Sequence, residues 1–141
     1  MERIWLLGSP DPEMEAIERL LDTAGEAVAY ATADGRRVHP GSAYRADPVE
    51  FAGADQVPEI VYLVECQPRL VLDSSPAEGP ATIPTAVVDH HRPGDPGYGR
   101  PAKEFLAASS IGQVVTELAR LGLLPDVPHL VTIAAADHCL G

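Results

Sequence analysis

Short apolar runs alternate along the chain with amphipathic segments, and this order predicts an α/β fold. Near-continuous apolar runs at 4–7, 59–66 and 85–88 are typical of buried parallel strands, and residues 26–32 predict a further strand. Apolar residues recur at helical spacing from Met14 onward and again over 110–120. Strands that alternate with helices predict a mostly parallel sheet flanked by helices in a Rossmann-like, three-layer arrangement.

Capping residues indicate where the two helices begin and end. Asp11 is a good N-cap for the first helix, and Gly25 ends it. Ser110 and Gln113 form the pattern of a capping box in the second helix, and Gly122 is placed as its C-terminal stop.

The remaining segments carry weaker patterns. Residues 33–58 are polar and rich in Gly, Pro, Asp and Arg, with at most a short helix near 48–54, and residues 70–72 favour a short extended piece. Glycines and prolines make 92–103 a loop, whereas the Ala-rich segment 128–141 favours a helix that ends in Asp-His-Cys.

Length and charge narrow the class of protein. The chain has 141 residues, which predicts a single domain over 1–141, and 45% of them are hydrophobic, which argues against disorder. Its formal net charge is -11, so the phosphate backbone of duplex nucleic acid repels it. General nucleic-acid binding is therefore not expected.

Cysteine usage and the first residues favour the cytoplasm. Cys66 and Cys139 have no disulfide-framework spacing, as expected in a reducing compartment. The start of the chain turns acidic too early for a signal peptide, and no run approaches the ~18 apolar residues of a membrane span. A membrane partner is not expected, whereas a homodimer is compatible with the sequence.

Acids and imidazoles follow four separate apolar segments. In an open α/β sheet, ligands bind outside the carboxyl ends of the strands, so these side chains are candidates for one site. Converging carboxylates are costly unless a cation compensates them, and Mn²⁺, Fe²⁺ or Co²⁺ accept mixed carboxylate and imidazole ligands. The residues concerned are Asp11, Glu13, Glu65, Asp89, His90, His91, Asp137 and His138.

Most of these residues also have a purely structural interpretation. Asp11 and Glu13 fit an N-cap and a first-turn acid, and Glu65 fits a solvated strand end. His138, near the end of the chain, needs no function. The tripeptide at 89–91 is harder to dismiss, because it places two imidazoles directly after a buried strand.

Four motifs in order resemble the DHH phosphoesterase superfamily, which includes RecJ-like nucleases, nanoRNases and family II pyrophosphatases. SPDPEMEAIERLL resembles the first motif and VYLVEC the second. VVDHHR is similar to the third and most specific motif, and ASSIG to the Ser-rich turn that follows it. LVTIAAADH resembles the fourth, an apolar helix that ends in a metal-binding aspartate.

The resemblance implies a role for each matching residue. It makes Asp89 a group that orients an imidazole and His91 a contact of the substrate phosphate, the two catalytic candidates. The candidate metal ligands are Asp11, Glu13, Glu65, His90 and Asp137. The candidate substrate-binding residues, besides His91, are Arg92, Arg100, Lys103 and Ser110.

The chain departs from the family pattern at three positions. Leu7 stands where the family has the histidine of the first motif, and Glu13 and Glu65 stand where it has aspartates. One metal site keeps a complete ligand set, and the other lacks its histidine. The family's second, substrate-gripping domain is not expected within these 141 residues.

Three hypotheses follow. The first is a metal-dependent phosphoesterase that uses one or two Mn²⁺ ions, or Mg²⁺ or Co²⁺, on a small nucleotide or phosphate ester. The second is a catalytically reduced relative that binds nucleotides or phosphate as a regulatory or partner module. The third is an unrelated α/β binding domain in which the DHH tripeptide is a coincidence.

Overall fold

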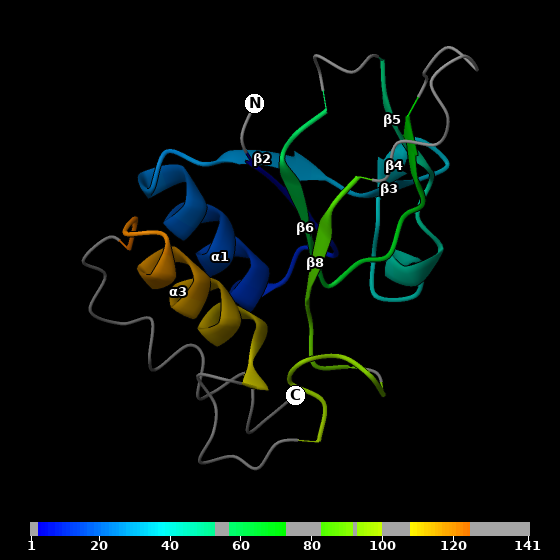
Figure 1. The fold of residues 1–141 in the computed structure, drawn as a ribbon. Helices are drawn as coiled ribbons and strands as arrows, with labels where there is room; N and C mark the ends of the chain where they lie inside the picture. The colour runs from blue at the N-terminus through cyan, green and yellow to red at the C-terminus, as the bar shows by residue number, and fades with distance from the viewer. Residues whose placement is uncertain (1–2, 53–56, 73–82, 92, 100–107, 125–141) are drawn as a thin grey trace.

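A parallel sheet forms the centre of the part of the chain that the structure describes. The computed structural model describes residues 3–52, 57–72, 83–91, 93–99 and 108–124. Within them, four parallel strands lie in the order β2-β1-β6-β8, which confirms the α/β prediction (Figure 1). Their bounds are β1 Arg3–Leu7, β2 Ala27–Tyr30, β6 Ile60–Val64 and β8 Thr85–Val88.

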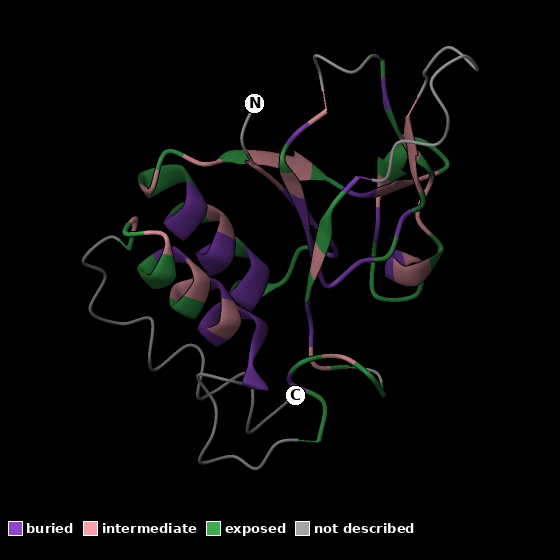
Figure 2. Cartoon of the chain, in the orientation of Figure 1, coloured by how far each residue is buried: buried purple, intermediate pink, exposed green. Residues whose placement is uncertain are grey.

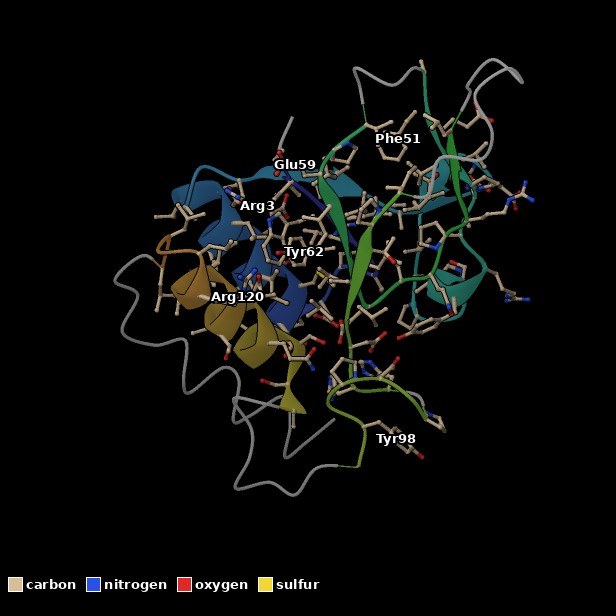
Figure 3. All side chains as sticks on the ribbon, in the orientation of Figure 1. Arg3, Phe51, Glu59, Tyr62, Tyr98 and Arg120 are labelled. Carbon is tan, nitrogen blue, oxygen red and sulfur yellow. The ribbon has the colours of Figure 1, made fainter. Side chains whose placement is uncertain are left out.

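Alternating side chains send each central strand into two separate cores. Trp5 and Tyr62 are paired in the register of β1 and β6, and their rings stack with centroids 3.8 Å apart. They face the helices, as do Leu7 and Val64, whereas the residues between them face the opposite side. Figure 3 shows Tyr62 on the helix side and Phe51 on the other.

Two amphipathic helices cover the first of these faces. α1 (Pro12–Thr23) and α3 (Ser110–Arg120) lie side by side, with their buried residues turned toward the sheet (Figure 2). Each fully buried aliphatic side chain on these faces contributes roughly 1.5–3 kcal/mol of transfer free energy. Neither described helix has the length and apolar character needed to cross a bilayer.

Short strands and a 3-10 helix cover the second face. Their side chains pack with Leu6, Val61 and Leu63 of the sheet in the second core. β5 pairs with β7 in parallel, and β3 with β4 in antiparallel orientation. The elements are β3 Thr32–Ala33, β4 Arg36–Arg37, η1 Ala43–Arg45, β5 Val49–Phe51 and β7 Leu70–Leu72. This layer gives the described residues between 33 and 52 the role that the sequence left open.

A tight hairpin joins β3 to β4. Asp34 and Gly35 form its two-residue turn, with φ of 53° and 77°. Positive φ at both positions is the hallmark of the turn that suits right-twisted strands, and Asp-Gly is a preferred sequence for it. The carboxylate of Asp47 accepts the amide N–H of both residues, which fixes the turn.

Several sequence-based boundaries are wrong, and each has a physical reason. The predicted strand 26–32 ends at Tyr30, and Thr32 begins the hairpin instead. The predicted short helix near 48–54 is strand β5, because Val49–Phe51 pairs with β7 and packs into the second core. The N-cap of α3 is Ser109, whose hydroxyl accepts the N–H of Gly112. The predicted helix at 128–141 lies outside the described residues.

Other boundaries are confirmed. Asp11 caps α1 and accepts the N–H of Met14 at 2.7 Å. Gly25 and Gly122, with φ of 77° and 73°, follow the ends of the two helices in the left-handed conformation that glycine adopts without strain. The extended piece at 70–72 is β7.

Candidate metal centre

The carboxyl ends of three neighbouring strands meet at one edge of the sheet. β1 leads into Gly8 and Ser9, β6 into Glu65, and β8 into Asp89. The N-termini of both helices lie at this edge, since Ser110 of α3 contacts Glu65 and the loop after β1 leads into α1. The polar residues that follow the strands are therefore brought together, as the topology predicts.

Gly8 allows two of these strand ends to touch. Its N–H donates to the carbonyl of Val64 at 2.9 Å. A Cβ atom at this position would lie 2.2 Å from the carbonyl oxygen of Glu65, so the backbones could not approach as they do. The close contact sets the loop that carries Ser9 beside Glu65.

Glu65 has a conformation that non-glycine residues seldom adopt. Its φ is 54°, in the left-handed region, at a cost of roughly 1–2 kcal/mol. The residue is 6% exposed, and its Oε1 accepts a hydrogen bond from the Ser110 hydroxyl at 3.1 Å. Strain of this kind gathers at functional sites, where the surrounding structure holds it in place.

Glu65, His90 and His91 form a group that could hold a metal ion. One potential ligand atom from each lies within 4.8 Å of the others. Oε1 of Glu65 is 3.4 Å from Nε2 of His90 and 3.4 Å from Nδ1 of His91. The side chains of Glu65 and His90 are 7% and 9% exposed, whereas that of His91 is 45% exposed and reaches the surface. Glu65 and His90 thus form the buried part of the group, and His91 lies on its solvent-facing side.

Asp89 holds the two histidines in place. The residue is 1% exposed, and its Oδ1 accepts the backbone N–H of His90, the backbone N–H of His91 and a hydrogen bond from Nδ1 of His91 at 2.8 Å. Its Oδ2 accepts the Tyr44 hydroxyl at 2.6 Å. A carboxylate that binds one ring nitrogen orients the imidazole. Nε2 of His91, rather than the Nδ1 that contacts Asp89 and Glu65, is therefore the nitrogen left to act as a ligand.

These contacts also shift the pKa values of Asp89 and His91. Burial raises the pKa of the Asp89 carboxyl, but the hydrogen bonds from His91, Tyr44 and the His90 amide together bring it below its ordinary value. The hydrogen bond to Asp89 raises the pKa of His91. Asp89 is therefore an anion at neutral pH, and it stabilises positive charge on its neighbours.

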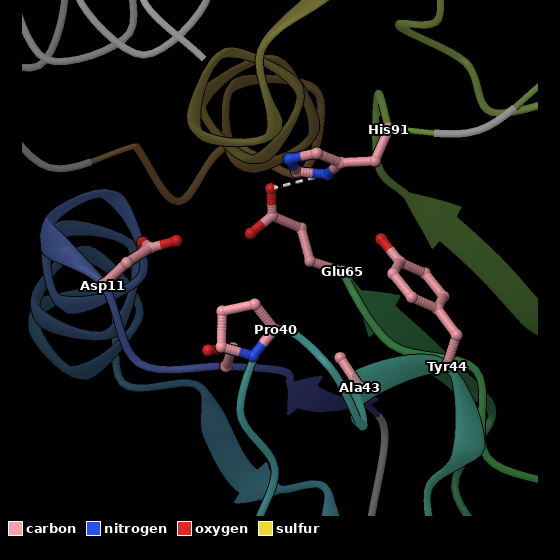
Figure 4. Close-up of a pocket in the computed structure, with 7 residues that line it drawn as sticks. Asp11, Pro40, Ala43, Tyr44, Glu65 and His91 are labelled. Carbon is pink, nitrogen blue, oxygen red and sulfur yellow. Dashed lines mark ion pairs between the residues drawn. The ribbon is translucent and has the colours of Figure 1, made fainter.

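A cavity of about 220 Å³ opens beside Glu65 and His91. Figure 4 shows Asp11 facing Glu65 across it. Ser9, which is 9% exposed, also lines the cavity, and its hydroxyl has no hydrogen-bond partner among the described residues. This hydroxyl is free to hydrogen-bond a molecule that enters the cavity. The lining is completed by Pro40, Ala43 and Tyr44.

Comparison with family models, curated proteins and solved structures gives no significant match. The function must therefore be inferred from the site itself. That site is one carboxylate and two imidazoles at the carboxyl ends of adjacent parallel strands, beside a cavity that can admit a small ligand.

The structure brings some of the predicted metal ligands together and separates others. Glu65 and His90 belong to the group, and His91, expected at the substrate phosphate, joins them. Asp11 lines the cavity but is also engaged as the cap of α1. Glu13 is buried at the N-terminus of α3, where its Oε2 accepts the N–H of Ile111 at 3.4 Å. The positive end of the helix dipole suits that carboxylate.

Of the remaining candidate metal ligands and substrate-binding residues, the structure describes only Ser110. The hydroxyl of Ser110, a residue expected at the substrate, donates a hydrogen bond to Glu65 and so positions a candidate ligand. Outside the described residues lie Asp137, Arg92, Arg100 and Lys103, and also His138, which was a candidate at the sheet edge.

Sequence reasoning missed Ser9 and Tyr44. Ser9 is the second residue after the predicted first strand, so its position at the sheet edge could have been inferred. Tyr44 lies in the polar segment 33–58, 45 residues before Asp89, and no local pattern connects the two. Burial and the contact with Asp89 both raise the pKa of Tyr44, so its hydroxyl stays protonated as a donor.

Proposed function

We propose that this chain is a metal-dependent phosphoesterase that acts on a small nucleotide or phosphate ester. The observation that carries the proposal is the group Glu65, His90 and His91, held by a strained strand end and by Asp89 beside an open cavity. The DHH-like sequence pattern, which contributes both histidines, supports the same reaction class.

The donor set favours a transition metal. Mg²⁺ prefers an all-oxygen shell, whereas Mn²⁺, Fe²⁺, Co²⁺ and Zn²⁺ accept imidazole together with carboxylate. Mn²⁺ is the ion that the resemblance implies. When bound, such an ion supplies Lewis-acid polarisation of a phosphoryl oxygen and acidifies a water molecule.

The residues of the chain hold and orient the reacting groups. Asp89 fixes the proton of His91 on Nδ1, and Tyr44 fixes Asp89 in turn. The Ser110 hydroxyl holds Oε1 of Glu65. These contacts keep the group in position before a substrate arrives, and preorganisation of this kind lowers the barrier to phosphoryl transfer. His91, the most exposed of the three, faces the cavity in which a phosphate would lie.

A catalytically reduced phosphate-binding module is the second candidate. Two observations favour it: Leu7 replaces the histidine of the family's first motif, and Asp11 and Glu13 are engaged at helix N-termini. In that case the group would bind a metal and a phosphate without turnover.

Metal binding is the first test. Protein stripped with EDTA is titrated with Mn²⁺, Co²⁺, Zn²⁺ and Mg²⁺ while its melting temperature is followed. Saturating Mn²⁺ at about 100 times Kd should stabilise the protein by about 2.7 kcal/mol. Glu65→Gln keeps the shape of the side chain and should abolish the shift. The matched control Glu50→Gln, on the exposed side of β5, should retain it.

Hydrolysis is the second test. With Mn²⁺, the wild-type protein should cleave bis-p-nitrophenyl phosphate or a dinucleotide, and His90→Ala and Asp89→Asn should each remove most of that activity. Metal binding without hydrolysis would leave the second candidate. If neither Mn²⁺ nor the other ions shift the melting temperature of the wild-type protein, both candidates are wrong.

A further inference from the structure

A second hollow lies on the other side of the segment that borders the metal cavity. Its volume is about 520 Å³, and it lies between the β3–β4 hairpin and the residues just before η1. Segment 39–44 forms a wall of both hollows, because His39 and Ser42 line the second one while Pro40, Ala43 and Tyr44 line the first. The full lining of the second hollow is Ala33, Asp34, Arg36, Arg37, His39 and Ser42.

This hollow is basic in an acidic molecule. The chain has a net charge of -11, and Arg3 and Arg120 are each paired with a glutamate. Among the described residues, Arg36 and Arg37 form no ion pair with a carboxylate. Because both arginines line the hollow, its wall carries positive charge that a bound anion can neutralise.

Arg37 is held in a fixed orientation. Its Nε and one terminal nitrogen both donate to the carbonyl of Gly8, at 3.3 and 3.2 Å, and its guanidinium lies 4.3 Å from the centroid of the Tyr30 ring. A guanidinium has five N–H donors, so these contacts leave others available to a ligand. Anchoring of this kind reduces the entropy lost when an anion binds.

His39 adds a further donor. Its Nδ1 accepts the backbone N–H of Gly41 at 3.0 Å, so in the neutral ring the proton is on Nε2. The Nε2–H group can then donate to an anion. Asp34 is the acid that lines the same hollow, and its backbone N–H, rather than its carboxylate, holds the hairpin turn through Asp47.

We infer that the hollow lined by Arg36, Arg37 and His39 is a binding site for a phosphate monoester group, separate from the metal centre. Two guanidinium groups and an imidazole N–H match the three terminal oxygens and double negative charge of such a group. Asp34 lowers the affinity of this site, since its carboxylate repels the anion.

Calorimetric titration of EDTA-treated protein tests this site without the metal centre. Inorganic phosphate, ribose 5-phosphate and adenosine monophosphate serve as probes, with adenosine as the uncharged control. All three phosphates should bind and adenosine should not. A preference for adenosine monophosphate over ribose 5-phosphate would identify a nucleotide as the source of the phosphate.

Substitutions that remove charged side chains test whether phosphate binds in this hollow. The double variant Arg36→Gln/Arg37→Gln should weaken phosphate binding by about tenfold or more, because charge-assisted hydrogen bonds are lost. The matched control Arg19→Gln/Arg69→Gln, which removes two exposed arginines elsewhere, should bind within about twofold of wild type. Asp34→Asn keeps a residue that tolerates positive φ and should tighten binding several-fold.

The inference is distinguishable from the proposed function. Glu65→Gln should leave phosphate binding in EDTA unchanged, even though it removes metal binding. The inference is overturned if wild-type protein binds none of the three phosphates, if both double variants lose affinity equally, or if Glu65→Gln alone abolishes binding.

Discussion

Glu65 combines a strained backbone with the central position in the candidate metal centre. Its φ of 54° follows from the turn that the chain makes after β6, where the Glu65 N–H donates to the carbonyl of Val88. The side chain is thereby directed at His90 and His91. A folded state that holds a residue in this way gives up stability in return for geometry, as functional sites often do.

The strain at this position can be measured with two truncations. At ordinary positions glycine is less stabilising than alanine by roughly 0.5–1 kcal/mol. At Glu65 the order should reverse, with Glu65→Gly more stable than Glu65→Ala by roughly 1 kcal/mol, because only alanine suffers in the left-handed region. Both variants lose the same carboxylate, so its contacts cancel in the comparison. Urea unfolding in EDTA measures the difference; alanine equal to or above glycine would contradict the strain.

Local patterns predicted the part of the site that is contiguous in sequence. Asp89, His90 and His91 follow a buried strand, and Glu65 ends another, so both could be placed at the sheet edge from apolar runs. Tyr44 could not be placed, because its contact with Asp89 depends on how the polar segment folds over the second face of the sheet.

At the level of elements, the sheet and helices were predictable and the second layer was not. Buried parallel strands are nearly continuous apolar runs, so β1, β6 and β8 stand out. Val49–Phe51 is too short to show a clear period of hydrophobic residues, and its pairing with β7 makes it a strand. The Asp34-Gly35 turn was a readable hairpin signal that the sequence interpretation passed over.

Two substitutions at the N-terminus of α1 can show whether Asp11 is only the cap of the helix or also a metal ligand. Asparagine caps a helix about as well as aspartate, so Asp11→Asn should change the free energy of unfolding little, whereas Asp11→Ala should cost about 1 kcal/mol. If Asp11 is only a cap, both variants keep the Mn²⁺ affinity of wild type. If it is also a ligand, both lose affinity, although only one loses stability. Urea unfolding and Mn²⁺ titration of the same two proteins decide between them.

At the level of the whole molecule, the ionisation of the carboxyl groups governs the pH range of stability. The sequence pI is about 4.7, so at pH 7 the molecule carries a large negative charge. Several carboxyls nevertheless have a lowered pKa because of their hydrogen bonds, among them Glu26, Asp89 and Glu117. These groups must take up protons before acid can remove their contribution to folding.

Glu26 provides a test of how the free energy of unfolding falls at acid pH. Hydrogen bonds from Arg3 lower the pKa of Glu26, burial opposes them, and the Trp5 indole N–H lowers it further. Because the folded pKa lies below the ordinary value of 4.5, the stabilisation is complete above that value and is lost as the pH falls through the folded pKa. The carboxylate is 8% exposed, so Glu26→Gln should lower the free energy of unfolding at pH 7 by about 1.5–3 kcal/mol.

The difference between wild type and Glu26→Gln should then shrink as the pH falls from 4.5 through the lowered pKa of Glu26, since wild-type Glu26 becomes neutral as well. Urea unfolding at a series of pH values follows it, with Glu59→Gln as control, because Glu59 is exposed and forms no ion pair among the described residues. That control should stay within about 0.5 kcal/mol of wild type at every pH. A Glu26→Gln difference that stays constant down to acid pH would show that the loss comes from packing or neutral hydrogen bonds rather than from the charge of the carboxylate.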